Sequence, residues 1–209
     1  MNSGSSLERL VFFSDAVFAI ALTLLALDLK LPEGIPAADL DDALVQAWPQ
    51  LFAYALSFLI ISRTWMSHRS DFARIRHFNV PLARLNLALL FFIAMLPAPT
   101  SILSDYGDDP TPWPSVLYAT NIAAVYLTMA AIWGYARRAG LLEREVAAHV
   151  HRPVFNARLV GAAIFLVSIP AAFALNSYTP LLWLLLLPAP WVTHRVSVYR
   201  QAREGTAQA

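Results

Sequence analysis

Few side chains in this 209-residue sequence could take part in proton or ion chemistry, and Asp15 is the most unusual of them. It lies inside an apolar run that opens with the capping sequence Ser5-Ser6-Leu7-Glu8, so a helix is predicted to begin near Ser6. Asp15 would lie about two turns after that start. If the helix spans a membrane, inserting a carboxylate there costs roughly 2.5–3.5 kcal/mol of free energy. Asp15 should therefore face neighbouring helices and hold a partner. We favour a structural contact over a proton-relay role.

The best partners for Asp15 lie in the next apolar segment. Trp65 and His68 are three residues apart and so share one face of a helix. We predict that Asp15 or Ser14 forms a hydrogen bond with His68 or with the indole of Trp65.

Other reactive groups are scarce. The sequence has no cysteine and neither a Gly-x-Ser-x-Gly nor a His-Glu-x-x-His pattern. His149 and His151 are two residues apart, which puts their rings on different helix faces, and we interpret them as loop histidines. The net charge of +1 does not indicate nucleic-acid binding. We therefore expect no enzyme, no metal site and no cofactor.

The composition indicates which solvent surrounds these groups. The chain is 58% hydrophobic and 14% charged, with a mean hydropathy of +0.54, whereas soluble domains carry about 25% charged residues. A soluble core of this size could not hide so much apolar surface. The sequence predicts an all-α integral membrane protein whose main partner is the lipid bilayer.

Six segments approach the roughly 20 apolar residues that a membrane span needs. Together they make a single transmembrane domain over residues 1–209, with no internal repeat. The turn-forming sequence from Asn176 to Pro180 divides the last long apolar stretch into two helices. The predicted helices are 10–31, 44–62, 82–103, 115–135, 159–175 and 181–196.

Arginine placement predicts the orientation. The segments after the second and fourth helices and the carboxyl-terminal tail are basic, whereas the opposite loops are acidic and have Lys30 as their only basic residue. By the positive-inside rule the basic side is cytoplasmic, and both termini lie there. Fourteen arginines beside one lysine also suggest a GC-rich bacterial genome. We expect a multi-pass protein of a bacterial inner (plasma) membrane.

One apolar stripe stands out on the first helix. Ile20, Leu24, Leu27 and Leu31 follow helical spacing, and Thr23 flanks them. Asp15 lies about 140° away around the helix, so the acid and the stripe serve different neighbours. Taken alone, such a stripe is more often a packing seam than a functional surface.

A family resemblance changes that weighting. The sequence Arg9-x-x-x-Phe13-Ser14-Asp15 before an Ala/Ile/Leu-rich helix resembles the signature of transmembrane protein 175 channels. The second and third helices agree, through Trp48-Pro49, Tyr54-x-x-Ser57-Phe58, Trp65-x-x-His68, Asn86-Leu87 and Leu96-Pro97-x-Pro99-Thr100. The specific part of the resemblance is confined to the first half of the chain.

The resemblance implies a potassium-permeable cation channel. First helices of the assembled repeats would line the pore, with Ile20, Leu24 and Leu27 as its constriction and Thr23 and Asp28 flanking it. Because the chain has one repeat, identical subunits would form a homotetramer that passes monovalent cations, with potassium as the expected permeant ion. The structural motif would comprise Arg9, Phe13, Ser14, Asp15, Trp65 and His68.

Three alternatives remain open. A proton-coupled secondary transporter would use Asp15 and His68 as a relay, although no matching pair of broken helices is evident. A membrane enzyme lacks a recognisable motif. A structural scaffold is opposed only by the family resemblance.

Overall fold

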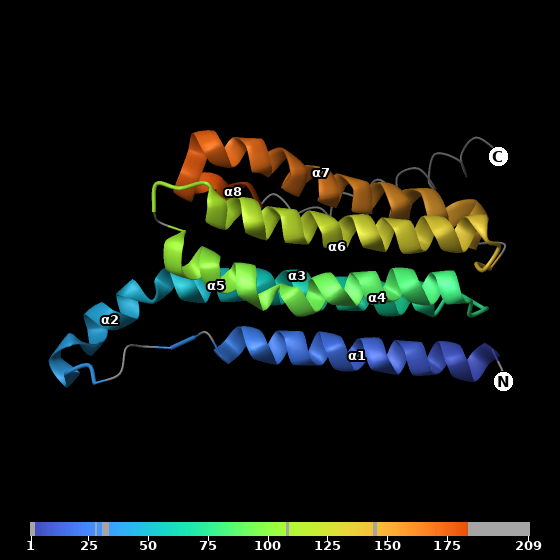
Figure 1. Cartoon of the computed structure of the whole chain (residues 1–209), viewed down its shortest axis with the longest axis horizontal. Helices are drawn as coiled ribbons and strands as arrows, with labels where there is room; N and C mark the ends of the chain where they lie inside the picture. Colours follow the sequence, from blue (N-terminus) through green and yellow to red (C-terminus); the bar gives the residue numbers. More distant parts are fainter. Residues whose placement is uncertain (1–2, 28, 31–33, 108, 144–145, 184–209) are drawn as a thin grey trace, which may run out of the picture.

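The computed structural model describes residues 3–27, 29–30, 34–107, 109–143 and 146–183, and all regular elements in these ranges are helices (Figure 1). In chain order they are α1 (Ser3–Leu27), η1 (Ala37–Asp39), α2 (Leu40–Gln46), α3 (Trp48–Phe72), α4 (Val80–Met95), α5 (Pro97–Tyr106), α6 (Trp113–Arg138), η2 (Val146–Val150), α7 (His151–Leu175), η3 (Asn176–Tyr178) and α8 (Thr179–Trp183).

The described residues contain four helical stretches that are long and apolar enough to cross a membrane. A fifth candidate is the pair formed by α2 with η1 and α3, whose two parts are bent by 46°. The predicted class, an all-helical protein with several membrane spans, is thereby confirmed. The stretches are Ser6–Leu27, Val80–Tyr106, Trp113–Arg138 and His151–Trp183, with Ala37–Gln46 and Trp48–Phe72 as the bent pair.

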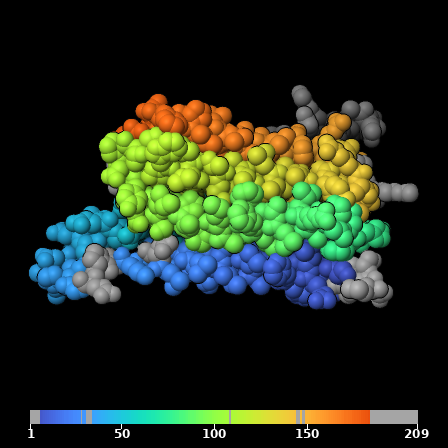
Figure 2. All heavy atoms as spheres, in the orientation of Figure 1, coloured from blue at the N-terminus to red at the C-terminus, as the bar shows by residue number. Residues whose placement is uncertain are grey.

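The helices run lengthwise beside one another, and α1 lies along one edge (Figure 1). It packs on α3, α4 and α5, which in turn meet α6, while α7 and α8 lie beyond α6. Figure 2 shows α1 as a continuous ridge along one side of the molecule. Only part of the surface of α1 is therefore covered by its own chain.

Arginines gather at one end of the bundle and many of the acidic residues at the other. The amino-terminal end of α1 shares one end of the bundle with the α3–α4 and α6–α7 connections (Figure 1), and α2 and the α5–α6 connection lie at the other. Arginines such as Arg74, Arg76 and Arg137 belong to the first end, and the acids Asp39, Asp41, Asp42, Asp105 and Asp109 to the second. At the basic end, Arg76 joins the two connections through an ion pair of 3.0 Å with Glu143.

Several predicted helix boundaries were wrong. The second helix was expected to end at residue 62, but α3 continues to Phe72 and includes Arg63, His68 and Asp71. The fifth helix was expected to begin at 159, but α7 begins at His151 and includes Arg158. In both places charged residues were assigned to loops although the bundle accommodates them inside helices.

The other boundaries differ less. The first helix was predicted over 10–31, with a cap near Ser6, whereas α1 begins at Ser3 and ends at Leu27. Helix α6 is longer than 115–135 at both ends. The predicted end at 175 is confirmed, since α7 stops at Leu175 and Asn176 adopts a positive φ of 44°. The sixth predicted helix, 181–196, falls almost wholly outside the described residues.

The third predicted helix, 82–103, is broken where its prolines lie. Here α4 ends at Met95 and α5 begins at Pro97, and the Leu96 amide bonds the Ile93 carbonyl at 3.3 Å. This shorter pairing frees the carbonyl of Phe92, which accepts a hydrogen bond of 3.1 Å from the Asn121 amide of α6. A neighbouring helix thus satisfies the backbone group that the break exposes, as membrane helices require.

The close approach of α6 and α7 depends on a glycine. A Cβ atom at Gly161 would lie 2.6 Å from the ring of Tyr126, so the aromatic ring occupies the space that any side chain would take. On the other helix, a Cβ at Gly134 would meet Phe155 at 3.3 Å. The two helices therefore pack with small residues at their contact, as membrane helices commonly do.

We predict that Gly161→Leu destabilises the protein by about 1–3 kcal/mol, the range for overpacked sites. The added side chain must displace the Tyr126 ring and separate α6 from α7. Thermal unfolding of the detergent-solubilised protein measures the effect. Ala163→Leu is the matched control, because Ala163 is exposed on the same helix. Equal melting temperatures for the two variants would contradict this packing.

Candidate functional site

Helix α1 presents two different faces. Ser14, Phe18, Ala21 and Leu25 follow helical spacing, are at most 1% exposed, and pack on α3, α4 and α5. The predicted stripe lies about 120° around the helix from this buried face. Its members are exposed in the single chain, at 57% for Ile20, 41% for Leu24 and 60% for Leu27. The stripe is therefore not a packing seam within this chain.

A hydrogen bond between side chains sets the rotation of α1 against α3. The indole nitrogen of Trp65 donates to Oδ1 of Asp15 at 2.7 Å, and both residues are half-buried. The guanidinium of Arg69 lies 5.1 Å from the centre of the Trp65 ring. One of the predicted alternatives, a hydrogen bond between Asp15 and the Trp65 indole, is thus confirmed, and the carboxylate has the partner that its position demands.

The neighbouring residue, Ser14, joins α1 to α4. The amide nitrogen of Asn86 donates to the Ser14 hydroxyl at 2.8 Å, and the hydroxyl donates to the Leu10 carbonyl at 2.8 Å. The amide oxygen of Asn86 lies 2.7 Å from Nε2 of His68. Ser14, His68 and Asn86 are all fully buried. One side chain of α4 therefore connects α1 with α3.

This network determines the tautomer of His68. Because the Asn86 amide group donates to Ser14, its oxygen faces His68, and Nε2 must carry the proton. The other nitrogen, Nδ1, is buried and makes no hydrogen bond with any described residue. The imidazole ring stacks on Phe72 at 4.3 Å and lies 5.5 Å from Phe18. Asp15 and His68 thus have separate partners and form no hydrogen-bonded relay.

The structure does not bring every predicted site residue into this network. Arg9 and Phe13 are exposed on α1. Thr23 is also exposed, and its hydroxyl donates to the Ile20 carbonyl at 2.8 Å. Asp28, predicted to flank the constriction, and Leu31, predicted as the last member of the stripe, lie outside the described residues.

Sequence reasoning missed Asn86 as the residue that joins the three helices. Its signal was present, because an amide inside an apolar helix must find partners. Which partners it would find could not be read from spacing, since the contacts join residues 18 and 72 positions apart.

A second buried polar centre was also missed. The guanidinium of Arg158 on α7 pairs with the carboxylate of Asp71 on α3, and both side chains are almost fully buried. The guanidinium also donates to the Met129 carbonyl at 3.1 Å and lies 5.3 Å from the centre of the Trp133 ring. This ion pair holds α3, α6 and α7 together, and removing one partner of such a pair typically costs about 3–5 kcal/mol.

The bundle and its polar centres define a multi-span helical membrane protein with an uncovered apolar stripe on its first helix. The family described as endosomal/lysosomal potassium channel TMEM175 matches residues 9–97. A potassium channel of Streptomyces collinus is 36% identical over 144 residues, which cover 68% of this chain and 68% of that protein. The chain belongs to the TMEM175 family.

Two further similarities agree with this assignment. The crystal structure of a lysosomal potassium-selective channel TMEM175 homolog from Chamaesiphon minutus has the same fold, with a TM-score of 0.80, 24% identity, and coverage of 90% of this chain and 98% of that one. The human endosomal/lysosomal proton channel TMEM175 is 27% identical over 184 residues, which cover 86% of this chain and 36% of the human protein.

We predict that Trp65→Phe destabilises the protein by about 1.5–3 kcal/mol, the range for a hydrogen bond to a charged group. The variant keeps an aromatic ring but leaves the Asp15 carboxylate without its donor. Thermal unfolding in detergent measures the loss. Trp48→Phe serves as the control, since Trp48 is an exposed tryptophan of the same helix. Equal melting temperatures for the two variants would mean that the hydrogen bond from the indole to Asp15 does not stabilise the protein.

Proposed function

We propose that this protein is a potassium-permeable channel through which ions pass passively. Four identical subunits would surround the pore with their α1 helices. The observation that carries the proposal is the face of α1 left bare by its own chain, where Ile20, Leu24 and Leu27 lie. Membership of the TMEM175 family and the names of its relatives, several of them potassium channels, support the choice of ion.

A path between subunits fits the packing of the single chain better than a path through it. The centre of the bundle is filled by large buried side chains, among them Leu89, Tyr118, Trp133 and Phe165. An ion would meet no continuous polar lining there. A closed ring of subunits would instead bring copies of one helix face together around an axis. The four-fold count itself comes from the family resemblance.

An apolar ring of this kind gates by excluding water. Where four Ile20 side chains approach one another, an ion would have to shed its hydration shell without receiving replacement ligands. The turns that carry Leu24 and Leu27 would extend the dry segment. A small tilt of α1 would widen the ring, admit water and allow conduction.

Cation preference has a separate electrostatic source. The carboxyl-terminal end of α1 carries about half a negative charge from its dipole, and Asp28 follows it in sequence. The same end of the bundle holds the acidic cluster of η1, α2 and the α5–α6 connection. Around a symmetry axis these charges would concentrate cations near the pore entrance.

The arrangement of charges also supports a location in the cell and an orientation in the membrane. We infer that the protein lies in a bacterial inner membrane with its arginine-rich end, and both termini, in the cytoplasm. The acidic end would then face outward.

A proton-coupled transporter is the alternative. It would need protons to move between Asp15 and His68, whereas Asp15 is bonded to Trp65 and Nδ1 of His68 is buried against aromatic rings. Saturable flux that requires a co-substrate would favour this alternative.

We predict that Ile20→Asn raises passive potassium flux several-fold, because amide groups in the narrowest ring keep it hydrated. The measurement is potassium-driven flux from liposomes that contain the purified protein. Val167→Asn is the matched control, since it makes a similar polar change at an exposed position of α7. If the wild-type protein conducts and Ile20→Asn shows the same flux, the constriction does not lie at Ile20.

A cysteine-free chain makes the orientation directly testable. We predict that, in intact cells, a membrane-impermeant maleimide labels an Asp41→Cys variant but not a His77→Cys variant. Both positions are exposed, and they lie at opposite ends of the bundle. After membrane permeabilisation both variants should react. The reverse pattern in intact cells would invert the assigned orientation.

A further inference from the structure

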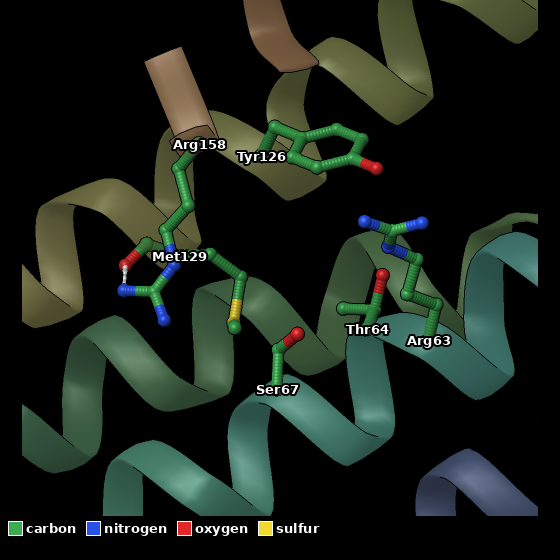
Figure 3. A pocket seen from close by; sticks show the side chains of 6 residues that line it. All are labelled: Arg63, Thr64, Ser67, Tyr126, Met129 and Arg158. Atoms are coloured by element: carbon green, nitrogen blue, oxygen red, sulfur yellow. Dashed lines mark hydrogen bonds between the residues drawn. The ribbon is translucent and has the colours of Figure 1, made fainter. Parts of the chain in front are cut away.

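A small pocket lies between α3, α6 and α7, away from the exposed stripe of α1 (Figure 3). Its volume is about 40 Å³, which is enough for roughly three water-sized groups. The lining residues are Arg63, Thr64, Ser67, Tyr126, Met129 and Arg158. Two of them are arginines, although the pocket lies within the helical bundle.

Arg63 is the unusual member of this set. It lies about two and a half turns before the end of α3, within a segment that is a candidate membrane span. In the described part of the chain it forms neither an ion pair nor a hydrogen bond, in contrast to Arg158, whose charge Asp71 neutralises. A guanidinium at membrane depth normally pairs with a negative group. None of the described residues therefore neutralises the positive charge of Arg63.

The neighbouring hydroxyl groups can donate hydrogen bonds, and no acidic side chain in the lining would compete with a bound anion. The side chains of Arg63, Ser67 and Tyr126 reach the same space from α3 and α6 (Figure 3). Neither the Ser67 hydroxyl nor the Tyr126 hydroxyl forms a hydrogen bond with a described residue, whereas Thr64 donates to the Ile60 carbonyl. No carboxylate lines the pocket. A guanidinium with two free hydroxyl groups matches the oxygen atoms of an anion.

We propose that this pocket binds a phosphate group. Arg63 would contact two phosphate oxygens through its planar fork of N–H groups, and Ser67 and Tyr126 would each donate one hydrogen bond. The volume fits the outer oxygens of one phosphate, and the exposed Arg63 side chain lies where the pocket meets the surface. Basic pockets between membrane helices bind lipid headgroups in this way. The proposal does not depend on which ion the protein conducts.

The test uses the full-length protein in a non-ionic detergent and follows thermal unfolding through its tryptophan fluorescence. Three ligands are titrated: phosphatidylglycerol, a diacylglycerol glucoside that lacks phosphate, and inorganic phosphate at constant ionic strength. The variants are Arg63→Gln and, as the matched control, Arg76→Gln, which removes the same charge from the exposed pair with Glu143. Ser67→Ala and Tyr126→Phe each delete one donor and keep the shape of the pocket.

We expect phosphatidylglycerol to stabilise the wild type and Arg76→Gln equally, and to bind Arg63→Gln about ten-fold more weakly, the equivalent of one charge-assisted hydrogen bond. Ser67→Ala and Tyr126→Phe should show smaller losses, and they keep the test informative if Arg63→Gln does not fold. Stabilisation by phosphatidylglycerol alone identifies a lipid as the source of the phosphate. Stabilisation by inorganic phosphate that requires Arg63 identifies the free ion. Equal stabilisation by the glucoside, equal binding in all variants, or no binding to the wild type would overturn the proposal.

Discussion

The requirement that every polar group at membrane depth finds a partner determines how α1 sits in this protein. Asp15 and Ser14 are adjacent on the helix, yet they bond different neighbours, Trp65 on α3 and Asn86 on α4. These two directional contacts, made by adjacent residues, fix both the rotation of α1 about its axis and its position along that axis relative to α3 and α4. Because the helix cannot turn without breaking them, its remaining face, with Ile20 and Leu24, is held outward. Apolar packing alone would fix neither, since lipid is as apolar as the residues concerned.

The same requirement explains the rest of the bundle. Arg158 and Asp71 compensate each other between α3 and α7, and Asn121 satisfies the carbonyl that the break between α4 and α5 exposes. Each polar contact joins helices that are far apart in sequence, so the contacts act as specific points of attachment in an otherwise uniform apolar interior. Arg63 departs from this pattern, which is why its pocket points to a ligand from outside the chain.

Much of this could be predicted from the sequence for local reasons. Apolar length and arginine placement are properties of short segments, and they predicted several spans and the segregation of charge to the two ends. A contact of Asp15 or Ser14 with the Trp65–His68 face could be predicted because a carboxylate in an apolar helix must have a partner, but which of these residues would bond could not. Helix ends were harder. Arg63 and Arg158 were taken as loop residues, since a charge ordinarily ends a span, but the bundle accommodates both inside helices.

The sequence by itself determined the class of protein, the apolar stripe of α1 and the need for a partner at Asp15, because composition, helical periodicity and the cost of burying charge are local properties. Only the tertiary structure decided which face of α1 its own chain covers, that Asn86 rather than Asp15 pairs with His68, and that Asp71 neutralises Arg158. These outcomes depend on how three or more helices rotate against one another. No periodicity in a single segment encodes that rotation, because each helix could bury its polar residues against several possible neighbours.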